Sequence, residues 1–232
     1  MMASRAPSPY DARRERLAAY FDGTARKAWI DLTSDVEVSG IRATVRAGRE
    51  AMRATLLSWL PKNLHGARLL DAGCGTGALG IAAAGRGGSV VAIDVAGGLV
   101  DIARDRANAG GTFIDWRTGD MLDTALGQFD HVVAMDSLIH YEPDDMVTAL
   151  AKLGQRCSGS ILFTFAPRTP LLAAMHRIGK LFPRSNRSPA IVPVAEDDMR
   201  RRLARIAEWK VGRSHRVTTG FYVSHAFELV RR

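Results

Sequence analysis

A glycine-rich turn at residues 66–77 constrains the fold of this chain more than any other stretch. Apolar residues of strand type lead into the turn, and an alanine-rich helical segment follows it. Strand, glycine turn and helix in that order form the nucleotide-binding unit of an open parallel sheet. Glycine permits the sharp turn and lets a ligand approach the backbone closely, because no Cβ intervenes. The three glycines at alternate positions are Gly73, Gly75 and Gly77.

Two acidic residues indicate the chemistry of the ligand. Asp94 ends the next apolar run about 20 residues after Gly73, the spacing at which an acid binds ribose hydroxyls. Asp71 precedes the turn, where its charge would repel a pyrophosphate but attract a cation. The G-x-G-x-G spacing also differs from the G-x-G-x-x-G of dinucleotide sites. These features favour S-adenosylmethionine, which carries a sulfonium and an amino group and no phosphate. A glycine turn without any ligand is the alternative.

Strand and helix patterns alternate through the rest of the chain and end in a hairpin. That order predicts an α/β fold, a doubly wound Rossmann-like sheet of seven strands with an antiparallel terminal hairpin. The expected strands start near residue 67 and continue at 89–94, 112–116, 129–134, 160–165, 211–217 and 221–230. The expected helices of this part span 97–109, 143–156, 170–183 and 196–206.

The chain divides into three expected parts. Residues 1–10 are predicted to be a disordered tail, 11–60 an N-terminal helical lid, and 61–232 the catalytic domain. Within that domain, residues 170–195 are expected to form an insertion on the substrate side. The lid is predicted to hold one helix at 11–30, a polar break at 31–39 and a second helix at 40–60.

A row of arginines repeats at helical spacing along the second lid helix, beside its apolar face. Two interpretations stay open for this row. It is either a solvated face or a docking surface for an anionic partner or lipid headgroups. Its members are Arg42, Arg46, Arg49 and Arg53.

Composition narrows the possible partners. The 232 residues carry a net charge of +8, which favours an acidic partner. No apolar run approaches the ~20 residues of a membrane helix, and the N-terminus lacks the apolar core of a signal peptide, so a cytoplasmic protein is expected. The two cysteines, Cys74 and Cys157, have no metal-type spacing and are expected to be small buried residues. Nucleic acid is not favoured, because no RNA-binding motif is visible.

The turn Asp71-x-Gly73-x-Gly75-x-Gly77 resembles motif I of class I S-adenosylmethionine-dependent methyltransferases. More specific stretches resemble the magnesium-protoporphyrin IX O-methyltransferases of bacteriochlorophyll synthesis, and this resemblance runs from about residue 10 to the end of the chain. The stretches are Tyr20-Phe21-Asp22-Gly23-Thr24, residues 41–48, Ser137-Leu138-Ile139-His140-Tyr141, Pro167-Arg168-Thr169-Pro170 and residues 179–184.

The resemblance implies transfer of a methyl group from S-adenosylmethionine to one propionate of Mg-protoporphyrin IX, giving the monomethyl ester. It implies His140 as catalytic residue, and no protein-bound metal, since the Mg belongs to the substrate. The implied cofactor-binding residues are Asp71, Gly73, Gly75, Gly77, Asp94, Asp120, Met121 and Asp136. The implied substrate-binding residues are Tyr20, Arg168, Met175, Lys180 and Arg184.

The sequence departs from the family pattern at one position, and other functions remain possible. Relatives of oxygenic organisms carry a tyrosine thought important for catalysis where this chain has Thr33, so that role does not transfer. The resemblance also suggests delivery of the porphyrin from the large subunit of magnesium chelatase, at the photosynthetic membrane. Two other functions stay open: another class I methyltransferase, acting on RNA or a small acid, and a non-catalytic nucleotide-sensing protein on the same fold.

Overall fold

The computed structural model describes residues 8–23, 26–33, 40–111, 113–168 and 190–232. Its centre is a seven-stranded sheet with the order β3-β2-β1-β4-β5-β7-β6, which confirms the expected fold class. The strands are β1 (Arg68–Ala72), β2 (Ser89–Asp94), β3 (Asp115–Thr118), β4 (Phe129–Ala134), β5 (Cys157–Phe165), β6 (Trp209–Thr219) and β7 (Tyr222–Arg231). The helices are α1 (Pro9–Asp22), α2 (Arg26–Thr33), α3 (Ile41–Trp59), α4 (Ala78–Ala84), α5 (Gly97–Ala109), α6 (Pro143–Gly154) and α8 (Glu196–Leu203).

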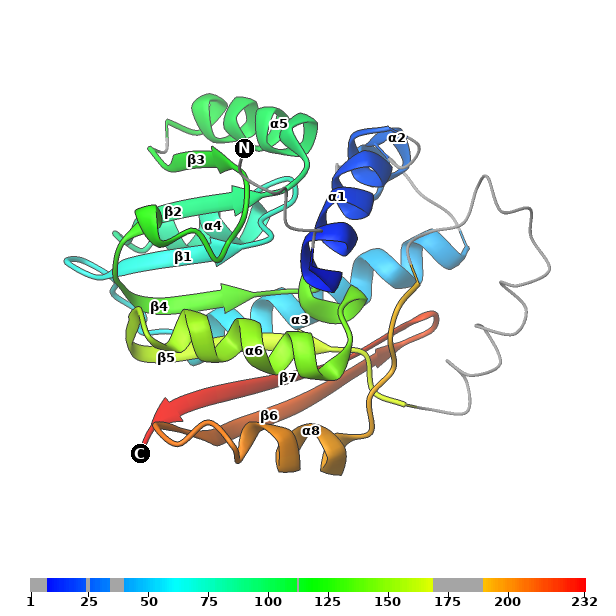
Figure 1. Ribbon diagram of the computed structural model, residues 1–232. Coiled ribbons are helices and arrows are strands. Elements are labelled where there is room, and N and C mark those ends of the chain that lie inside the picture. The colour runs from blue at the N-terminus through cyan, green and yellow to red at the C-terminus, as the bar shows by residue number, and fades with distance from the viewer. Residues whose placement is uncertain (1–7, 24–25, 34–39, 112, 169–189) are drawn as a thin grey trace, which may run out of the picture.

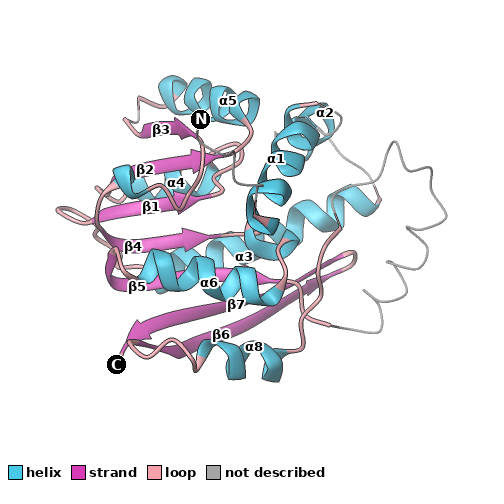
Figure 2. Ribbon diagram, in the orientation of Figure 1, coloured by secondary structure: helices cyan, strands magenta, loops and turns pink. Residues whose placement is uncertain are grey.

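The sheet reverses its direction of winding between β1 and β4. The first five strands pair in parallel, and β7 enters antiparallel between β5 and β6. Figure 1 shows α6 and α8 in front of the sheet and α3 behind it. The point where an open parallel sheet reverses is where this architecture binds ligands, outside the carboxyl ends of the strands. In Figure 2 the helices α1 and α2 lie beside those ends.

The apolar core occupies both faces of the sheet. One cluster joins α6 and α8 to the sheet and includes Met146 and Phe163, neither of which is exposed. The other joins α3 and α4 through Met52, Leu56 and Leu79. The central strands are buried on both sides, as parallel strands between two helical layers must be. Both layers therefore fix the strand ends that carry the candidate site.

The N-terminal region differs from its predicted boundaries. The first helix begins at Pro9, because Ser8 caps it and exchanges hydrogen bonds with Asp11 in a capping box. The expected tail of 1–10 is therefore wrong for residues 8–10, while 1–7 lie outside the described residues. The predicted single helix at 11–30 is two helices, α1 and α2, and α2 continues to Thr33, into the expected polar break.

The remaining elements follow their predicted order with shifted ends. Strand β3 starts at Asp115, three positions later than expected, and Phe113 before it is 91% exposed. Strand β5 starts earlier, at Cys157, where it pairs with Phe129 of β4. Helix α8 ends at Leu203 rather than 206. The predicted helix at 170–183 and most of the expected insertion at 170–195 lie outside the described residues.

Candidate active site

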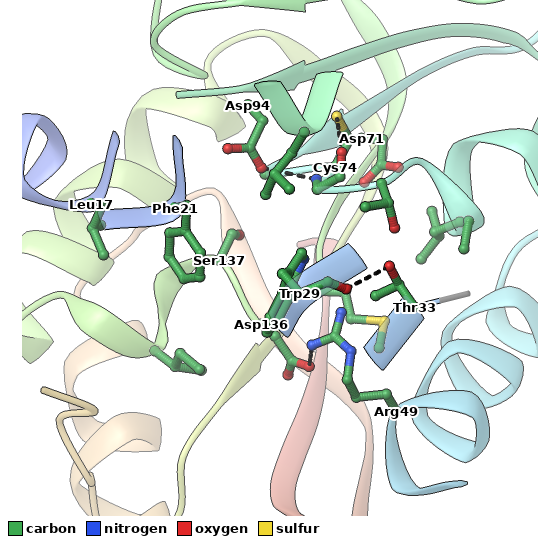
Figure 3. A pocket seen from close by; sticks show the side chains of 18 of the residues that line it. Leu17, Phe21, Trp29, Thr33, Arg49, Asp71, Cys74, Asp94, Asp136 and Ser137 are labelled. Carbon is green, nitrogen blue, oxygen red and sulfur yellow. Dashed lines mark hydrogen bonds and ion pairs between the residues drawn. The ribbon is translucent and has the colours of Figure 1, made fainter. Parts of the chain in front are cut away.

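A cavity of about 580 Å³ lies at the carboxyl ends of the strands. Its walls come from the glycine turn, the end of β2, the connection after β4 and the three N-terminal helices (Figure 3). Among the predicted site residues, it is lined by Tyr20, Asp71, Gly73, Gly75, Asp94, Met121, Asp136 and His140. The volume is in the ordinary range for a small-molecule site.

Backbone hydrogen bonds hold the glycine turn against β2. The amides of Gly73 and Cys74 donate to the Ile93 carbonyl at 2.8 and 3.0 Å. Gly73 adopts a φ of 84°, and a Cβ on it would lie 2.2 Å from the Cβ of Ser137. Only glycine meets both requirements, because an L-residue is strained at this φ and has no space here. Gly73 thus lets the turn pack directly against Ser137 in the connection after β4.

Gly77 was also predicted to bind the cofactor, but unlike Gly73 and Gly75 it does not line the cavity. It is buried outside the lining of the cavity, and a Cβ on it would lie 2.5 Å from the Trp116 ring and 2.8 Å from Ala103. Its amide donates to the Cys74 carbonyl at 2.9 Å. Gly77 therefore closes the turn and permits close packing of α4.

Asp94 and Asp71 occupy the predicted strand ends but in different environments. The Asp94 carboxylate accepts from the amides of Gly75 and Ala96, both at 2.9 Å, and points into the cavity (Figure 3). Asp71 is 2% exposed and accepts from the Gly80 amide of α4 at 2.9 Å. Burial, and secondarily the charge of Asp94, raise the pKa of Asp71 to about 7 although the Gly80 amide opposes the shift. Burial likewise raises the pKa of Asp94.

Asp120 binds the first helix rather than lining the cavity. Its carboxylate accepts from the Tyr10 hydroxyl at 2.8 Å and from the Arg14 guanidinium at 2.6 Å. Its neighbour Met121 is 6% exposed and lines the cavity. The implied binding of the cofactor by Asp120 would therefore compete with two protein donors.

Asp136 carries the densest hydrogen-bond network of the site. Its side chain, 6% exposed, accepts from Arg49 of α3 at 2.5 Å. Tyr222 of β7 donates to both carboxylate oxygens at 3.1 Å, and Thr164 and Ser224 donate to one of them. Asp136 also has a φ of 53°, unusual for a residue with a side chain. The residue was predicted to bind the cofactor, and the structure surrounds its carboxylate with protein donors.

The arginine row of α3 faces the cavity. All four residues line it, and all but Arg42 are partly buried. Arg46 donates to the carbonyls of Asp31 and Leu32 at 2.6 and 3.0 Å, which ties α3 to the end of α2. Arg53 pairs with Glu50 at 2.5 Å. The row therefore forms a positively charged wall.

His140 lies on the far side of the strand reversal from Asp94. It is 7% exposed, lines the cavity, and its Nδ1 lies 3.4 Å from the Ala190 carbonyl. The ring of Phe21 is 6.0 Å away. Arg168 is exposed and lies outside the lining. Met175, Lys180 and Arg184 lie outside the described residues.

Polar contacts fasten α1 over the strand ends. Asp22 accepts from the Gly97 and Gly98 amides at the start of α5, at 3.2 and 2.8 Å. Arg13 donates to the His140 carbonyl and pairs with Glu142 at 3.1 Å. Tyr10 stacks on Tyr141 with ring centroids 5.0 Å apart. These contacts reach the connections after β2 and β4, so α1 covers the cavity.

Trp29 is a central wall residue that the sequence reasoning missed. Its ring lies under the Arg49 guanidinium at 4.6 Å and beside Phe21 at 5.5 Å. Its Nε1 is 3.3 Å from the position of a Cβ on Gly75. Thr33, the departure from related sequences, also lines the cavity and donates to the Trp29 carbonyl at 2.8 Å. The only signal for Trp29 in the sequence was a large aromatic residue in a segment predicted to be helical.

The described residues contain no group of three or more His, Cys, Asp or Glu side chains placed to hold a metal. Cys74 lines the cavity and is partly exposed, whereas Cys157 is buried, and both are free thiols. Burial, and then the charges of Asp71 and Asp94, raise the pKa of the Cys74 thiol. A thiol of raised pKa is a poor nucleophile at neutral pH. Among the described helices, none is long and apolar enough to cross a membrane.

The sheet order, the glycine turn and the acid after β2 define a class I S-adenosylmethionine-dependent methyltransferase, and residues 69–158 match a family described as "Methyltransferase domain". Residues 134–231 match a second family, "Magnesium-protoporphyrin IX methyltransferase C-terminus". The chain is 49% identical to the magnesium-protoporphyrin O-methyltransferase of Rhodobacter capsulatus, over 96% of this chain and 98% of that protein. It therefore belongs to the magnesium-protoporphyrin O-methyltransferase family.

More distant relatives agree with this membership. The chloroplastic magnesium protoporphyrin IX methyltransferase of Arabidopsis thaliana is 30% identical over 94% of this chain and 71% of that protein. The crystal structure of magnesium protoporphyrin IX methyltransferase from Synechocystis PCC 6803 with bound SAH has a TM-score of 0.83 and 27% identity. It covers 94% of this chain and 100% of that one.

Proposed function

We propose that the protein transfers the methyl group of S-adenosylmethionine to a propionate carboxylate of Mg-protoporphyrin IX, giving the monomethyl ester in bacteriochlorophyll synthesis. The observation that carries this proposal is one cavity that joins the glycine turn and Asp94 to His140 across the strand reversal. A transferase needs such an arrangement, because donor and acceptor must meet in one enclosed space. The relatives named above carry this activity in their names.

The residues of the donor half fit S-adenosylmethionine, which supplies an electrophilic methyl group when bound. Gly73 and Gly75 line the cavity and carry no Cβ, so a ligand can approach their backbone closely. Asp94 is positioned for the ribose hydroxyls, and Met121 for the adenine ring. The Ser137 hydroxyl is buried in the cavity wall with no hydrogen-bond partner in the described part of the chain. A bound ligand would satisfy this hydroxyl, which supports occupation of the site.

The acceptor half has to desolvate and align a carboxylate. A propionate is ionised at neutral pH, so no general base is needed. Alignment and desolvation together can lower a barrier by roughly 7–11 kcal/mol at best. We assign the desolvation and alignment of the carboxylate to His140 and Tyr20, which line the cavity with Phe21 and Ile139. Helices α1 and α2 act as a lid that excludes water, a role for which the contacts of Asp22 and Arg13 provide support.

The decisive assay incubates the purified protein with S-adenosylmethionine labelled in its methyl group. Separate reactions contain Mg-protoporphyrin IX, metal-free protoporphyrin, bulk RNA or no acceptor, and products are separated by chromatography. We expect label in the monomethyl ester of Mg-protoporphyrin IX and none in RNA. Transfer to RNA alone would establish the alternative, a class I methyltransferase that acts on RNA. Cofactor binding without transfer to any acceptor would indicate a sensing protein.

We further propose that the protein receives its porphyrin from the large subunit of magnesium chelatase at the photosynthetic membrane. The net charge of +8 and the poor solubility of the porphyrin support such a handover. The α3 arginines, which were considered for this docking, line the cavity instead. Flotation with anionic vesicles and pull-down with that subunit, each at low and high salt, test the two contacts separately. If the protein neither floats with the vesicles nor is pulled down by the subunit at low salt, this proposal is wrong.

A further inference from the structure

Helix α3 forms one wall of the cavity, and its two ends contact different parts of the fold. Near its start, the Thr44 hydroxyl accepts from the Phe221 amide at the β6–β7 turn, at 3.4 Å. Near its end, Met52 and Leu56 share an apolar cluster with Leu79 of α4, directly after the glycine turn. The arginine row on this helix therefore extends along the cavity wall from the side of the β6–β7 turn toward α4. Arg42 and Arg46 belong to the end away from α4, and Arg53 belongs to the end near it.

The four arginines differ in how their charge is balanced. Asp136 neutralises Arg49, which also stacks on Trp29, and Glu50 pairs with Arg53. Within the described part of the chain, no carboxylate pairs with Arg42, whose side chain is exposed at the cavity. Arg46 uses two of its five N–H donors on backbone carbonyls. The end of the wall away from α4 therefore has two guanidiniums and no described carboxylate paired with Arg42.

We propose that Arg42, with Arg46 one turn along α3, binds the propionate of the porphyrin that is not methylated. This inference rests on the function proposed above and names the recognition site within it. Residues four apart on a helix face lie about 5–6 Å apart at their Cβ atoms, so two guanidiniums can converge on one carboxylate. Paired guanidinium and carboxylate groups form short, charge-assisted hydrogen bonds with geometric specificity.

The chemistry of the reaction decides which propionate these arginines hold. A carboxylate oxygen attacks the methyl carbon, the carbon–sulfur bond breaks, and the bonding pair remains on sulfur as the neutral thioether. The attacking carboxylate loses its negative charge as the ester forms. A guanidinium bound to it would stabilise the ground state more than the transition state and slow the transfer. The second propionate keeps its charge throughout, so an arginine there adds affinity without this cost.

The experiment compares binding of three porphyrins to the complete protein. Mg-protoporphyrin IX and its monomethyl ester both retain the non-reacting carboxylate, whereas the dimethyl ester has none. Affinities are measured by porphyrin absorbance and by quenching of tryptophan fluorescence. We expect Arg42→Gln to weaken binding of the diacid and the monoester by about tenfold, the loss of one charge-assisted hydrogen bond. Binding of the dimethyl ester should be unchanged, and Arg42→Lys should restore part of the loss.

Kinetics provide a second readout. Because the interaction is the same in ground and transition states, Arg42→Gln should raise KM for Mg-protoporphyrin IX about tenfold and leave kcat within about twofold. Two controls remove one arginine charge elsewhere. Arg53→Gln does so on the same helix at the end near α4, and Arg201→Gln on α8, where the side chain is 70% exposed. Neither control should change the ratio of diacid to dimethyl ester affinity.

Three outcomes would overturn the inference. The first is an equal loss of all three porphyrins in Arg42→Gln, which would indicate a structural role. The second is unchanged binding in that variant. The third is a fall in kcat at unchanged KM, which would place Arg42 at the reacting carboxylate. A wild-type protein that forms no monoester would refute the proposed function instead, while the ester comparison would still decide whether Arg42 recognises a carboxylate.

Discussion

Arg49 of helix α3 donates a 2.5 Å hydrogen bond to Asp136, the second residue after strand β4. The two residues are 87 positions apart in sequence and join a covering helix to the centre of the sheet. Because Tyr222 donates to the same carboxylate from β7, three elements meet at one buried charge. The Arg49 guanidinium also covers Trp29, so this pair fixes a wall of the cavity.

Breaking this pair should destabilise the protein. Arg49→Gln leaves the Asp136 carboxylate buried with hydroxyl donors but no opposite charge, which should cost about 2–3 kcal/mol of unfolding free energy. The double variant Arg49→Gln with Asp136→Asn should recover most of that loss, because no charge remains buried. Urea unfolding of both single variants and the double variant measures the coupling. Additive losses would mean that the two residues act independently.

Asp94 should control cofactor affinity. Its carboxylate holds the glycine turn through the Gly75 amide and faces the cavity. Asp94→Ala should weaken S-adenosylmethionine binding by about 1.5–3 kcal/mol, the value of hydrogen bonds to a charged group. Asp101→Ala on the exposed face of α5 is the matched control. Calorimetry that gives equal dissociation constants for wild type and Asp94→Ala would remove Asp94 from the site.

Gly73 should tolerate substitution less well than a glycine of similar conformation elsewhere. Gly73 and Gly66 have φ values of 84° and 78°, but a Cβ on Gly66 would have no atom within 4 Å. Gly66→Ala should therefore cost only the conformational strain, about 1–2 kcal/mol. Gly73→Ala adds overlap with Ser137, a further loss of about 1–3 kcal/mol. Thermal unfolding of the two variants compares the losses, and equal values would contradict the packing argument.

Asp71 should make stability depend on pH. Its folded-state pKa of about 7 exceeds the ordinary value of 3.8, so the folded protein binds the proton more tightly than the unfolded chain does. Stability contributed by this group is therefore full below about pH 4 and is lost as the pH rises to 7. Asp71→Asn keeps an acceptor for the Gly80 amide and removes the titration.

The comparison requires unfolding free energies of wild type and Asp71→Asn at pH 4.5, 6 and 8. The difference should shift in favour of the variant as the pH rises, by on the order of 2–4 kcal/mol in total. Asp115→Asn, on the edge strand, serves as a control without a buried carboxylate. Parallel curves for wild type and Asp71→Asn would show that the group does not titrate in this range.

His140 should affect turnover more than cofactor binding. Its Nδ1 faces the Ala190 carbonyl, which favours a proton on that nitrogen. In that tautomer Nε2 is an acceptor that can ligate the substrate's Mg²⁺, and in the imidazolium both ring nitrogens are donors that can hold the propionate. His140→Ala should lower kcat/KM about 10²-fold, within the range lost when positioning fails, at nearly constant cofactor affinity.

Two acceptors separate the roles of His140. A loss of transfer that is selective for Mg-protoporphyrin IX over metal-free protoporphyrin would identify Mg²⁺ ligation. An equal loss with both acceptors would identify positioning of the carboxylate. Near wild-type turnover of His140→Ala with both would end its assignment as a catalytic residue.

The local sequence determined the parts of this protein that depend on short-range patterns. The glycine turn, Asp94 at the end of β2 and the strand-helix alternation are encoded within a few residues each, so the fold class and the place of these residues at the cavity were predictable. The boundary of α1 was missed although its signal is local, since Ser8, Pro9 and Asp11 form a complete capping box. The start of β3, which was predicted three residues too early, has no such local signal, because strand ends depend on pairing with the neighbouring strand.

Only the tertiary structure decided which charges meet. Helical periodicity places Arg42, Arg46, Arg49 and Arg53 on one stripe, but it does not determine which surface that stripe faces. Packing of α3 between the β6–β7 hairpin and α4 directs the stripe into the cavity. In the same way, Asp120 is predictable as an acid after β3, yet its partners Tyr10 and Arg14 come from a helix more than 100 residues earlier. Contacts at such separations follow from the packing of whole elements, which no local pattern records.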